Sequence, residues 1–338
     1  AFVNDPLRLL RAFRFAAAFN FVIDDDTMSE IRRHAHLAAQ PAAERILTEL
    51  TKLFAAKNAA ECLRQMEAVG VLYALFPEMT PMKVHRANNV TDLTALEHTF
   101  RVVECMEALL LNPQDYFTPE ALTLEQFKSI NEPQMRFRLK MAALLHDVGK
   151  PAAKSVGADG RIHYYSHENF GAETAVNILK RLKCSNRDIL LVSSYISAHI
   201  KALTMFNNHR KAKRPAHKRA LFYLDHDALL PPLFYLFWAD ALSKKTTLKE
   251  GYLDFIYDLA RVYVEEYLPR SQRPLPLNGH DLRRIFNPKA IMFNFMIREL
   301  NVENIVQAEF TAEQALKSAR ATFYMLKSRD KQTRANNN

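Results

Sequence analysis

The scarcity of glycine constrains the fold of this chain more than any other feature. Only 7 of its 338 residues are glycine, about 2% against a usual ~7% in globular proteins. The tight turns of β-hairpins, dinucleotide-binding turns and phosphate-binding loops all depend on glycine. The sequence therefore predicts an all-α fold in which short polar loops join the helices.

Length and loop-like stretches predict three domains. A chain of 338 residues in which 49% are hydrophobic and 25% charged can bury a sizeable core, which excludes an intrinsically disordered protein. A polar stretch over residues 80–89 precedes a histidine-rich helical region that ends near Ser243, and a helical pattern interrupted by the proline-rich residues 269–276 follows it. We predict a first helical domain over 1–85, a histidine-rich helical domain over 86–245 and a helical C-terminal region over 246–338.

The balance of charges predicts a polyanionic partner. There are 46 Lys and Arg against 37 Asp and Glu, a formal charge of +9, and nucleic acid is the first candidate partner for such a chain. A basic enzyme without such a partner is the alternative. The densest basic run predicts RNA-binding residues, although a solvated helix face remains open: Arg210, Lys211, Lys213, Arg214, Lys218 and Arg219.

The cysteines and apolar runs indicate a cytoplasmic protein. Cys62, Cys105 and Cys184 form neither a Cys-x-x-Cys pair nor an even-numbered disulfide framework, which favours a reducing compartment. We find no run of about 18 apolar residues, the length that a membrane helix needs, and no signal peptide. The sequence therefore predicts no membrane partner.

The strongest chemical signal is the string ALLHDVGKP, which contains His146 and Asp147. An imidazole nitrogen beside a carboxylate oxygen can bind one divalent metal if other elements complete the ligand set. His98 and Asp240, both within predicted helices, are suitable completions. Mg, Mn, Ni, Fe or Zn would suit such a site and would permit a metal-activated water. The simpler alternative is that His146 and Asp147 pair with each other or cap the helix, which we expect to end at Gly149 and Pro151.

Two later histidines extend this prediction. His167 and His199 could hold a second metal or orient a scissile phosphate, and a core or surface role is the alternative for each. Among the histidines of this region, His163 is the weakest candidate for either of these roles.

These motifs resemble the HD superfamily of metal-dependent phosphohydrolases over residues 92–243. The resemblance implies an all-helical domain in which His98, His146, Asp147 and Asp240 bind metal and a phosphomonoester or phosphodiester is cleaved. It also implies that Lys150 lies near phosphate. We expect Lys150, His167 and His199 to stabilise the charge that develops on the phosphate.

The N-terminal segment carries a second resemblance, on Asn4-Asp5-Pro6-Leu7-Arg8. It is similar to the neck of the class II tRNA nucleotidyltransferases and poly(A) polymerases, whose Glu-Asp-x-x-Arg motif reads the Watson–Crick edge of the incoming nucleotide. Asp5 and Arg8 match this motif, Asn4 replaces its glutamate, and we add Arg11 as a nucleotide-binding residue. A helix cap with an i,i+3 ion pair is the alternative. Segments 42–50, 75–78 and 277–282 also resemble this family.

The family's catalytic head is not seen in this sequence, because no Gly-Ser signature followed by paired aspartates occurs. The resemblance implies a protein that adds nucleotides from ATP or CTP to RNA 3′ ends, tRNA being the expected partner. We expect this chain, which looks like a piece of something longer, to act as an HD phosphohydrolase without polymerising nucleotides. The alternatives are a non-catalytic RNA-binding module with a structural HD site and a free-standing HD nucleotide phosphohydrolase.

Overall fold

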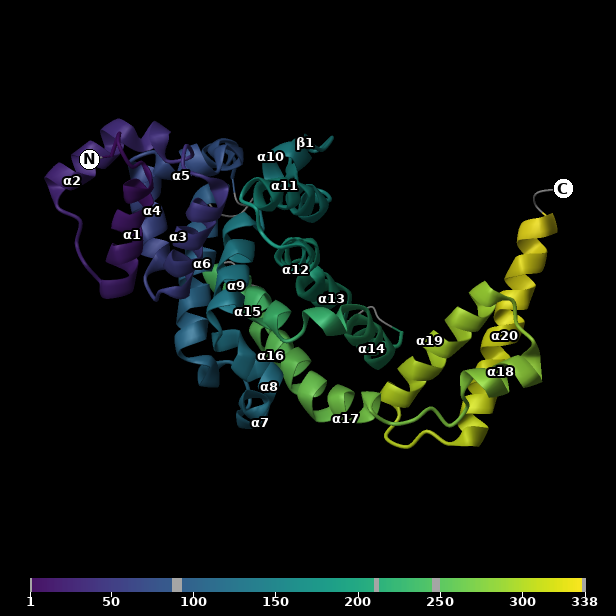
Figure 1. Ribbon diagram of the computed structural model, residues 1–338. Helices are drawn as coiled ribbons and strands as arrows, with labels where there is room; N and C mark the ends of the chain where they lie inside the picture. Colours follow the sequence, from purple (N-terminus) through teal and green to yellow (C-terminus); the bar gives the residue numbers. More distant parts are fainter. Residues whose placement is uncertain (1, 87–92, 210–212, 245–249, 336–338) are drawn as a thin grey trace. The chain divides into compact units, whose positions relative to one another are not determined.

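The computed structural model describes residues 2–86, 93–209, 213–244 and 250–335. The chain packs as two compact units (Figure 1), of which the first comprises residues 1–207 and 229–257 and the second comprises 208–228 and 258–338. The predicted boundaries after residues 85 and 245 stay predictions.

The all-α prediction is confirmed. In the described residues the only strands are β1 (Ser155–Val156) and β2 (Ile162–His163), which pair antiparallel. The α-helices before residue 146 are α1 (Leu7–Phe19), α2 (Asp25–His34), α3 (Ala43–Ala55), α4 (Ala59–Ala68), α5 (Val71–Leu75), α6 (Ala95–Leu111), α7 (Pro119–Thr123), α8 (Glu125–Lys128) and α9 (Pro133–Leu145). The remaining ones are α10 (Lys150–Ala153), α11 (His167–Arg181), α12 (Asn186–Ala198), α13 (Lys201–His209), α14 (Pro215–His226), α15 (Pro232–Ser243), α16 (Tyr252–Val262), α17 (Leu268–Ser271), α18 (Gly279–Phe286), α19 (Ala290–Val306) and α20 (Ala312–Ala335). Short 3₁₀ turns and one π-helical turn, Tyr263–Tyr267, connect some of them.

Polar side chains fix where several helices begin. The Thr94 hydroxyl accepts the Glu97 N–H at the start of α6, and the Ser185 hydroxyl accepts the Asp188 N–H at the start of α12. Each bond satisfies one of the N–H groups that a helix leaves unpaired at its first turn. Asp5 makes no such bond at α1, because Pro6 occupies the N-cap position without a side-chain cap.

The core of the first unit forms around α15, which packs against α6 and α9. Nearly every residue of α15 is buried, including Phe234, Leu236 and Phe237. Because aliphatic and aromatic side chains fill this core, the polar groups buried in it need partners of their own. His98 on α6 and Asp240 on α15 are two such groups.

The second unit is a smaller set of helices in which α14 packs against α19 and α19 against α20. Its apolar cluster includes Leu282, Met296, Leu300, Ala315 and Ala319. The Thr311 hydroxyl accepts the Gln314 N–H and the Gln314 side chain accepts the Thr311 N–H at the start of α20. This reciprocal pair is a capping box.

One helical stretch contradicts the prediction that no segment is long and apolar enough to cross a membrane. Among the described residues, Asn186–Asn208 meets that test by length and composition. A single such helix is weak evidence, since core helices of soluble proteins pass the same test. In this one 33% of the apolar window is buried, and Val192, Tyr195 and Ile196 are among the buried residues of the stretch.

Candidate metal centre

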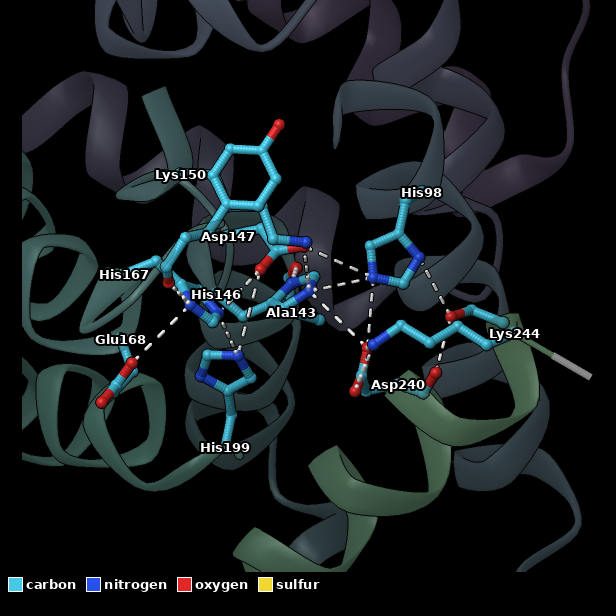
Figure 2. A network of polar contacts seen from close by, with 12 residues as sticks. His98, Ala143, His146, Asp147, Lys150, His167, Glu168, His199, Asp240 and Lys244 are labelled. Carbon is cyan, nitrogen blue, oxygen red and sulfur yellow. Dashed lines mark hydrogen bonds and ion pairs between the residues drawn. The ribbon is translucent and has the colours of Figure 1, made fainter. Parts of the chain in front are cut away.

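Six imidazole and carboxylate side chains from separate elements converge in the first unit (Figure 2). His98 comes from α6, Asp240 from α15, and His146 and Asp147 follow the last residue of α9. His167 is the first residue of α11, and His199 follows α12. Five of the six are buried and His167 is partly buried. The structure therefore brings together the four predicted metal ligands and both predicted additional histidines.

The six side chains form two triads that share a central position. His98, His146 and Asp240 make one triad, and Asp147, His167 and His199 make the other; within each, the ligand atoms lie within 4.8 Å of one another. Asp147 links the two.

The two oxygens of Asp147 face different triads. Its Oδ2 lies 3.2 Å from His146 Nε2 and 3.5 Å from His98 Nε2. Its Oδ1 lies 3.4 Å from His167 Nε2 and 3.9 Å from His199 Nε2. If each triad held a cation, the Asp147 carboxylate would offer one oxygen to each.

Hydrogen bonds at the outer nitrogens fix the tautomers of three histidines. The Nδ1 atoms of His146, His167 and His199 lie 2.8, 2.8 and 2.6 Å from backbone carbonyl oxygens. A carbonyl oxygen only accepts, so each Nδ1 carries the proton and donates it. In the neutral ring the Nε2 atom then presents a lone pair to the centre of the cluster.

The same reasoning extends to His98 through Ser243. The Ser243 hydroxyl donates its one proton to the Asp240 carbonyl at 2.7 Å. Its oxygen therefore accepts from His98 Nδ1 at 3.2 Å, which leaves a lone pair on His98 Nε2 as well.

Lone pairs consequently face each other across the cluster. His98 Nε2 lies 3.3 Å from His146 Nε2, and His167 Nε2 lies 3.3 Å from His199 Nε2. Two facing lone pairs repel unless a cation lies between them, and two carboxylates add further negative charge. The donor set therefore fits divalent cations.

Burial lowers the pKa of three of the imidazoles, those of His98, His167 and His199, and so favours their uncharged forms. It lowers the pKa of His98 to about 4 and that of His199 to about 3. A neutral imidazole is the form that binds metal. Burial also opposes the charged form of Asp240, but the Lys244 ammonium holds the pKa of that carboxyl well below its usual range.

Two lysines bind the two carboxylates of the cluster. Lys150 Nζ lies 2.5 Å from Asp147 Oδ2, so the residue predicted to lie near phosphate is next to the centre. Lys244 Nζ lies 2.7 Å from Asp240 Oδ1 and 2.8 Å from its Oδ2. Sequence reasoning missed Lys244 and Ser243, although both lie within one helical turn of Asp240, where side chains share a face.

Gly149 has a different role from the one predicted. The helix α9 already ends at Leu145, and Pro151 lies in the first turn of α10. A Cβ added at Gly149 would lie 2.2 Å from the His167 carbonyl oxygen and 2.3 Å from the Gly171 amide nitrogen. Gly149 therefore allows the HD segment to approach the backbone of α11, which positions His167.

The predicted nucleotide-binding residues also lie together, at the start of α1. The Asp5 carboxylate is 3.6 Å from Arg8 Nε, 3.8 Å from Arg11 Nη1 and 3.6 Å from Arg45 Nη2. Arg11 Nε also bonds the buried Glu49 on α3 at 3.2 Å. The two N-terminal segments that carry the second resemblance are thus joined by ion pairs.

The predicted RNA-binding run is described only in part, since Arg210 and Lys211 lie outside the described residues. Arg214 forms an ion pair with Glu303, and Arg219 with Asp258 at 2.7 Å. Lys213 and Lys218 are exposed. Part of the positive charge of this run is therefore balanced within the second unit.

Two known protein families match parts of this chain. Residues 20–83 match the family described as the probable RNA and SrmB-binding site of polymerase A, and residues 95–245 match the HD domain. The chain is 31% identical to the CC-adding tRNA nucleotidyltransferase of Thermus thermophilus and 30% identical to the A-adding tRNA nucleotidyltransferase of Deinococcus radiodurans. Each alignment covers 82% of this chain but only 57% and 59% of those relatives.

Solved structures show the same fold. The Thermotoga maritima CCA-adding enzyme complexed with tRNA aligns with a TM-score of 0.56 at 16% identity, over 95% of this chain and 62% of that one. A CCA-adding enzyme with CTP aligns with a TM-score of 0.57 at 15% identity, over 95% and 60% of the two chains.

Proposed function

The chain is a member of the tRNA nucleotidyltransferase family over its RNA-binding and HD regions, and from this premise we propose that its HD region is a metal-dependent phosphohydrolase. The observation that carries the proposal is the set of four imidazole lone pairs and two carboxylates that converge on one buried centre.

His98, His146 and Asp240 would hold one cation and His167 and His199 another, with Asp147 between them. Imidazole nitrogen suits Mn, Fe, Ni and Zn, whereas Mg prefers an all-oxygen set. Four imidazoles therefore favour the first group over Mg. Bound divalent cations supply Lewis acidity and generate a nucleophile from water at neutral pH.

The protein's own groups have separate tasks in this reaction. His167 and His199 have no N–H facing the centre, which makes them ligands rather than donors to a phosphate. Lys150 is the donor beside Asp147, and its ammonium would bind a phosphate oxygen as negative charge develops there.

The test is hydrolysis of a generic phosphodiester, a phosphomonoester and a 2′,3′-cyclic nucleotide by the metal-loaded chain. Asp147→Asn removes the charge that both triads share, so metal content and turnover should fall together, turnover by at least about a hundredfold. Asp159→Asn, an exposed carboxylate on the β1–β2 turn, is the matched control. A wild-type chain that loads metal but hydrolyses none of the three substrates would contradict the proposal.

We further propose that the whole protein adds nucleotides to tRNA 3′ ends, as the names of its relatives state for them. These 338 residues contain no Gly-Ser signature with paired aspartates, so this segment alone should not polymerise nucleotides. Asp5, Arg8 and Arg11 would then contact the incoming nucleotide, and a cytoplasmic location would follow from this role.

An RNA-binding module without hydrolase activity is the second candidate, favoured by the match over residues 20–83. It predicts RNA binding that weakens steeply with salt, because neutralised phosphates release counterions. Hydrolysis lost in Asp147→Asn while RNA affinity is kept would show that the two properties are separate.

A further inference from the structure

The C-terminal half of α1 and the residues just after it carry three exposed phenylalanines. Phe15, Phe19 and Phe21 are 42%, 58% and 64% exposed. Their rings contact one another, since the Phe15 and Phe19 centroids lie 5.9 Å apart and those of Phe19 and Phe21 lie 5.4 Å apart. Single exposed apolar side chains are normal, whereas a contiguous group of them marks an interaction site. We call these three residues the aromatic ladder.

The backbone holds Phe21 beside Phe19 although Phe21 lies beyond the helix. Asn20 ends α1 in the left-handed conformation, with φ +55°, which asparagine tolerates better than most residues. The Phe21 N–H then donates to the Ala16 carbonyl oxygen at 3.2 Å. The turn at the end of the helix therefore builds the ladder into the fold.

Two arginines precede the ladder on the same face of α1. Arg8, Arg11, Phe15 and Phe19 follow one another at spacings of three and four residues, which place side chains on one face of a helix. The Arg8 and Arg11 side chains are 56% and 40% exposed, while the opposite face of α1 is buried. At ~1.5 Å per residue, the face from Arg8 to Phe19 is about 16 Å long. A strand stacked at ~3.4 Å per nucleotide fits about four nucleotides in that length.

The charge of α1 decides which kind of partner fits this face. The helix contains three arginines and no acidic residue, and the Arg14 guanidinium lies 3.7 Å from the centroid of the Phe15 ring. The three aspartates at positions 24–26 lie at the start of α2, where the Asp24 carboxylate accepts the Thr27 N–H. An apolar protein segment would leave the arginines without a role. Single-stranded nucleic acid uses both features, because its phosphates pair with cations and its bases stack on aromatic rings.

We propose that the aromatic ladder binds the single-stranded 3′ end of an RNA by stacking its last bases, with the terminus directed toward Arg8 and Arg11. This inference rests on the proposed addition of nucleotides to RNA 3′ ends. It places the terminus next to Asp5, where the incoming nucleotide would lie. Stacking tolerates any base, because every base has an aromatic face.

The test separates the contribution of the bases from that of the phosphates. Fluorescence anisotropy measures binding of the full chain to labelled hexaadenylate and to an abasic hexamer, which keeps the phosphates and lacks the bases. Wild type is compared with the double variant Phe19→Ser, Phe21→Ser. The matched control is Leu111→Ser with Leu190→Ser, two leucines that are 45% and 65% exposed on other helices.

We expect wild type to bind hexaadenylate at least about tenfold more tightly than the abasic hexamer, the contribution of about one stacked base. The double serine variant should lose at least about tenfold in affinity for hexaadenylate and less than about twofold for the abasic hexamer. Phe19→Tyr with Phe21→Tyr, which keeps both rings, should bind as wild type does, and so should the leucine control.

The outcomes separate the inference from the function on which it rests. A wild-type chain that binds neither hexaadenylate nor tRNA contradicts the RNA-directed function itself. A chain that binds tRNA but binds the two hexamers equally overturns only the inference. An unchanged affinity of the double serine variant for hexaadenylate, together with a changed sedimentation coefficient, also overturns it and identifies the ladder as a protein–protein surface.

Discussion

At the scale of single residues, the orientation of His98 depends on a hydroxyl that is not itself a ligand. Ser243 donates to the Asp240 carbonyl and accepts from His98 Nδ1, so one side chain fixes both the tautomer and the ring angle. The sequence predicted four metal ligands and two further histidines, because each is a residue type with metal-binding atoms, and the structure brings these six side chains together. The sequence did not predict Ser243 or Lys244, whose roles depend on the helical turn that Asp240 shares with them.

Ser243→Ala should weaken metal binding about tenfold while the fold is kept. The variant removes the acceptor that holds the proton on His98 Nδ1, and loss of such outer hydrogen bonds costs metal affinity by about 10–100-fold. Metal titration of the variant checks this. Ser193→Ala, whose hydroxyl bonds the Leu190 carbonyl on the exposed side of α12, should bind metal as wild type does.

Gly149→Ala should destabilise the chain by more than about 3 kcal/mol, beyond the usual cost of overpacking. The added Cβ meets two backbone atoms of α11 rather than a movable side chain. Chemical denaturation measures the loss. In Gly160→Ala nothing lies within 4 Å of the new Cβ, but φ is +76°, so only about 1 kcal/mol should be lost. Similar losses of stability in the two variants would contradict the conclusion that Gly149 is needed for close contact with the α11 backbone.

At the scale of elements, local capping was predictable where side chain and backbone are near in sequence. The Thr-x-x-Gln pattern at Thr311 predicts a capping box for the last helix, and Thr311 and Gln314 form it. The Thr-x-x-Glu pattern of Thr27 and Glu30 likewise predicts that the second helix starts at Thr27, which is wrong, because the Asp24 carboxylate accepts the Thr27 N–H and the helix begins at Asp25. Both residues are acceptable caps, and only the backbone conformation decides between them.

A buried ion pair joins elements that are distant in sequence. Lys140 Nζ on α9 bonds Glu107 Oε1 on α6 at 2.7 Å and the Ala56 carbonyl oxygen, which follows α3. Glu107 Oε1 also accepts the Ala59 N–H at the start of α4. No local pattern predicts a lysine that is 1% exposed, because its partners lie 33 and 84 residues away.

Lys140→Met should lower the free energy of unfolding by about 3–5 kcal/mol, the usual cost of leaving one buried charge without its partner. Adding Glu107→Gln removes that charge but keeps an acceptor for the Ala59 N–H, so most of the loss should be recovered. Denaturant unfolding of the single and double variants measures this. A double variant no more stable than Lys140→Met would contradict the account.

At the scale of the whole molecule, the buried imidazoles make stability depend on pH. The folded-state pKa values of His98 and His199, about 4 and about 3, lie below the ordinary 6.5. Between these values the unfolded chain binds protons that the folded chain does not, so stability rises with pH. The contribution is fully present above pH 6.5 and is lost progressively as the pH falls toward the folded-state values.

The free energy of unfolding of the metal-free chain should therefore fall as the pH decreases below 6.5. Two protons give a slope of up to about 2.7 kcal/mol per pH unit. Urea unfolding over a pH series measures it, and His199→Gln should lower the slope by up to about 1.4 kcal/mol per pH unit, the share of one proton. A flat profile between pH 6.5 and 4.5 would show that these imidazoles are not buried in the neutral form.

Equilibrium dialysis with Mn²⁺, followed by metal analysis, measures how many cations the six side chains hold. We expect about two cations per wild-type chain, about one in His98→Ala and in His167→Ala, and none held tightly in Asp147→Ala, because Asp147 faces both triads. A chain that binds no metal, or the same amount in all three variants, would contradict a two-cation centre.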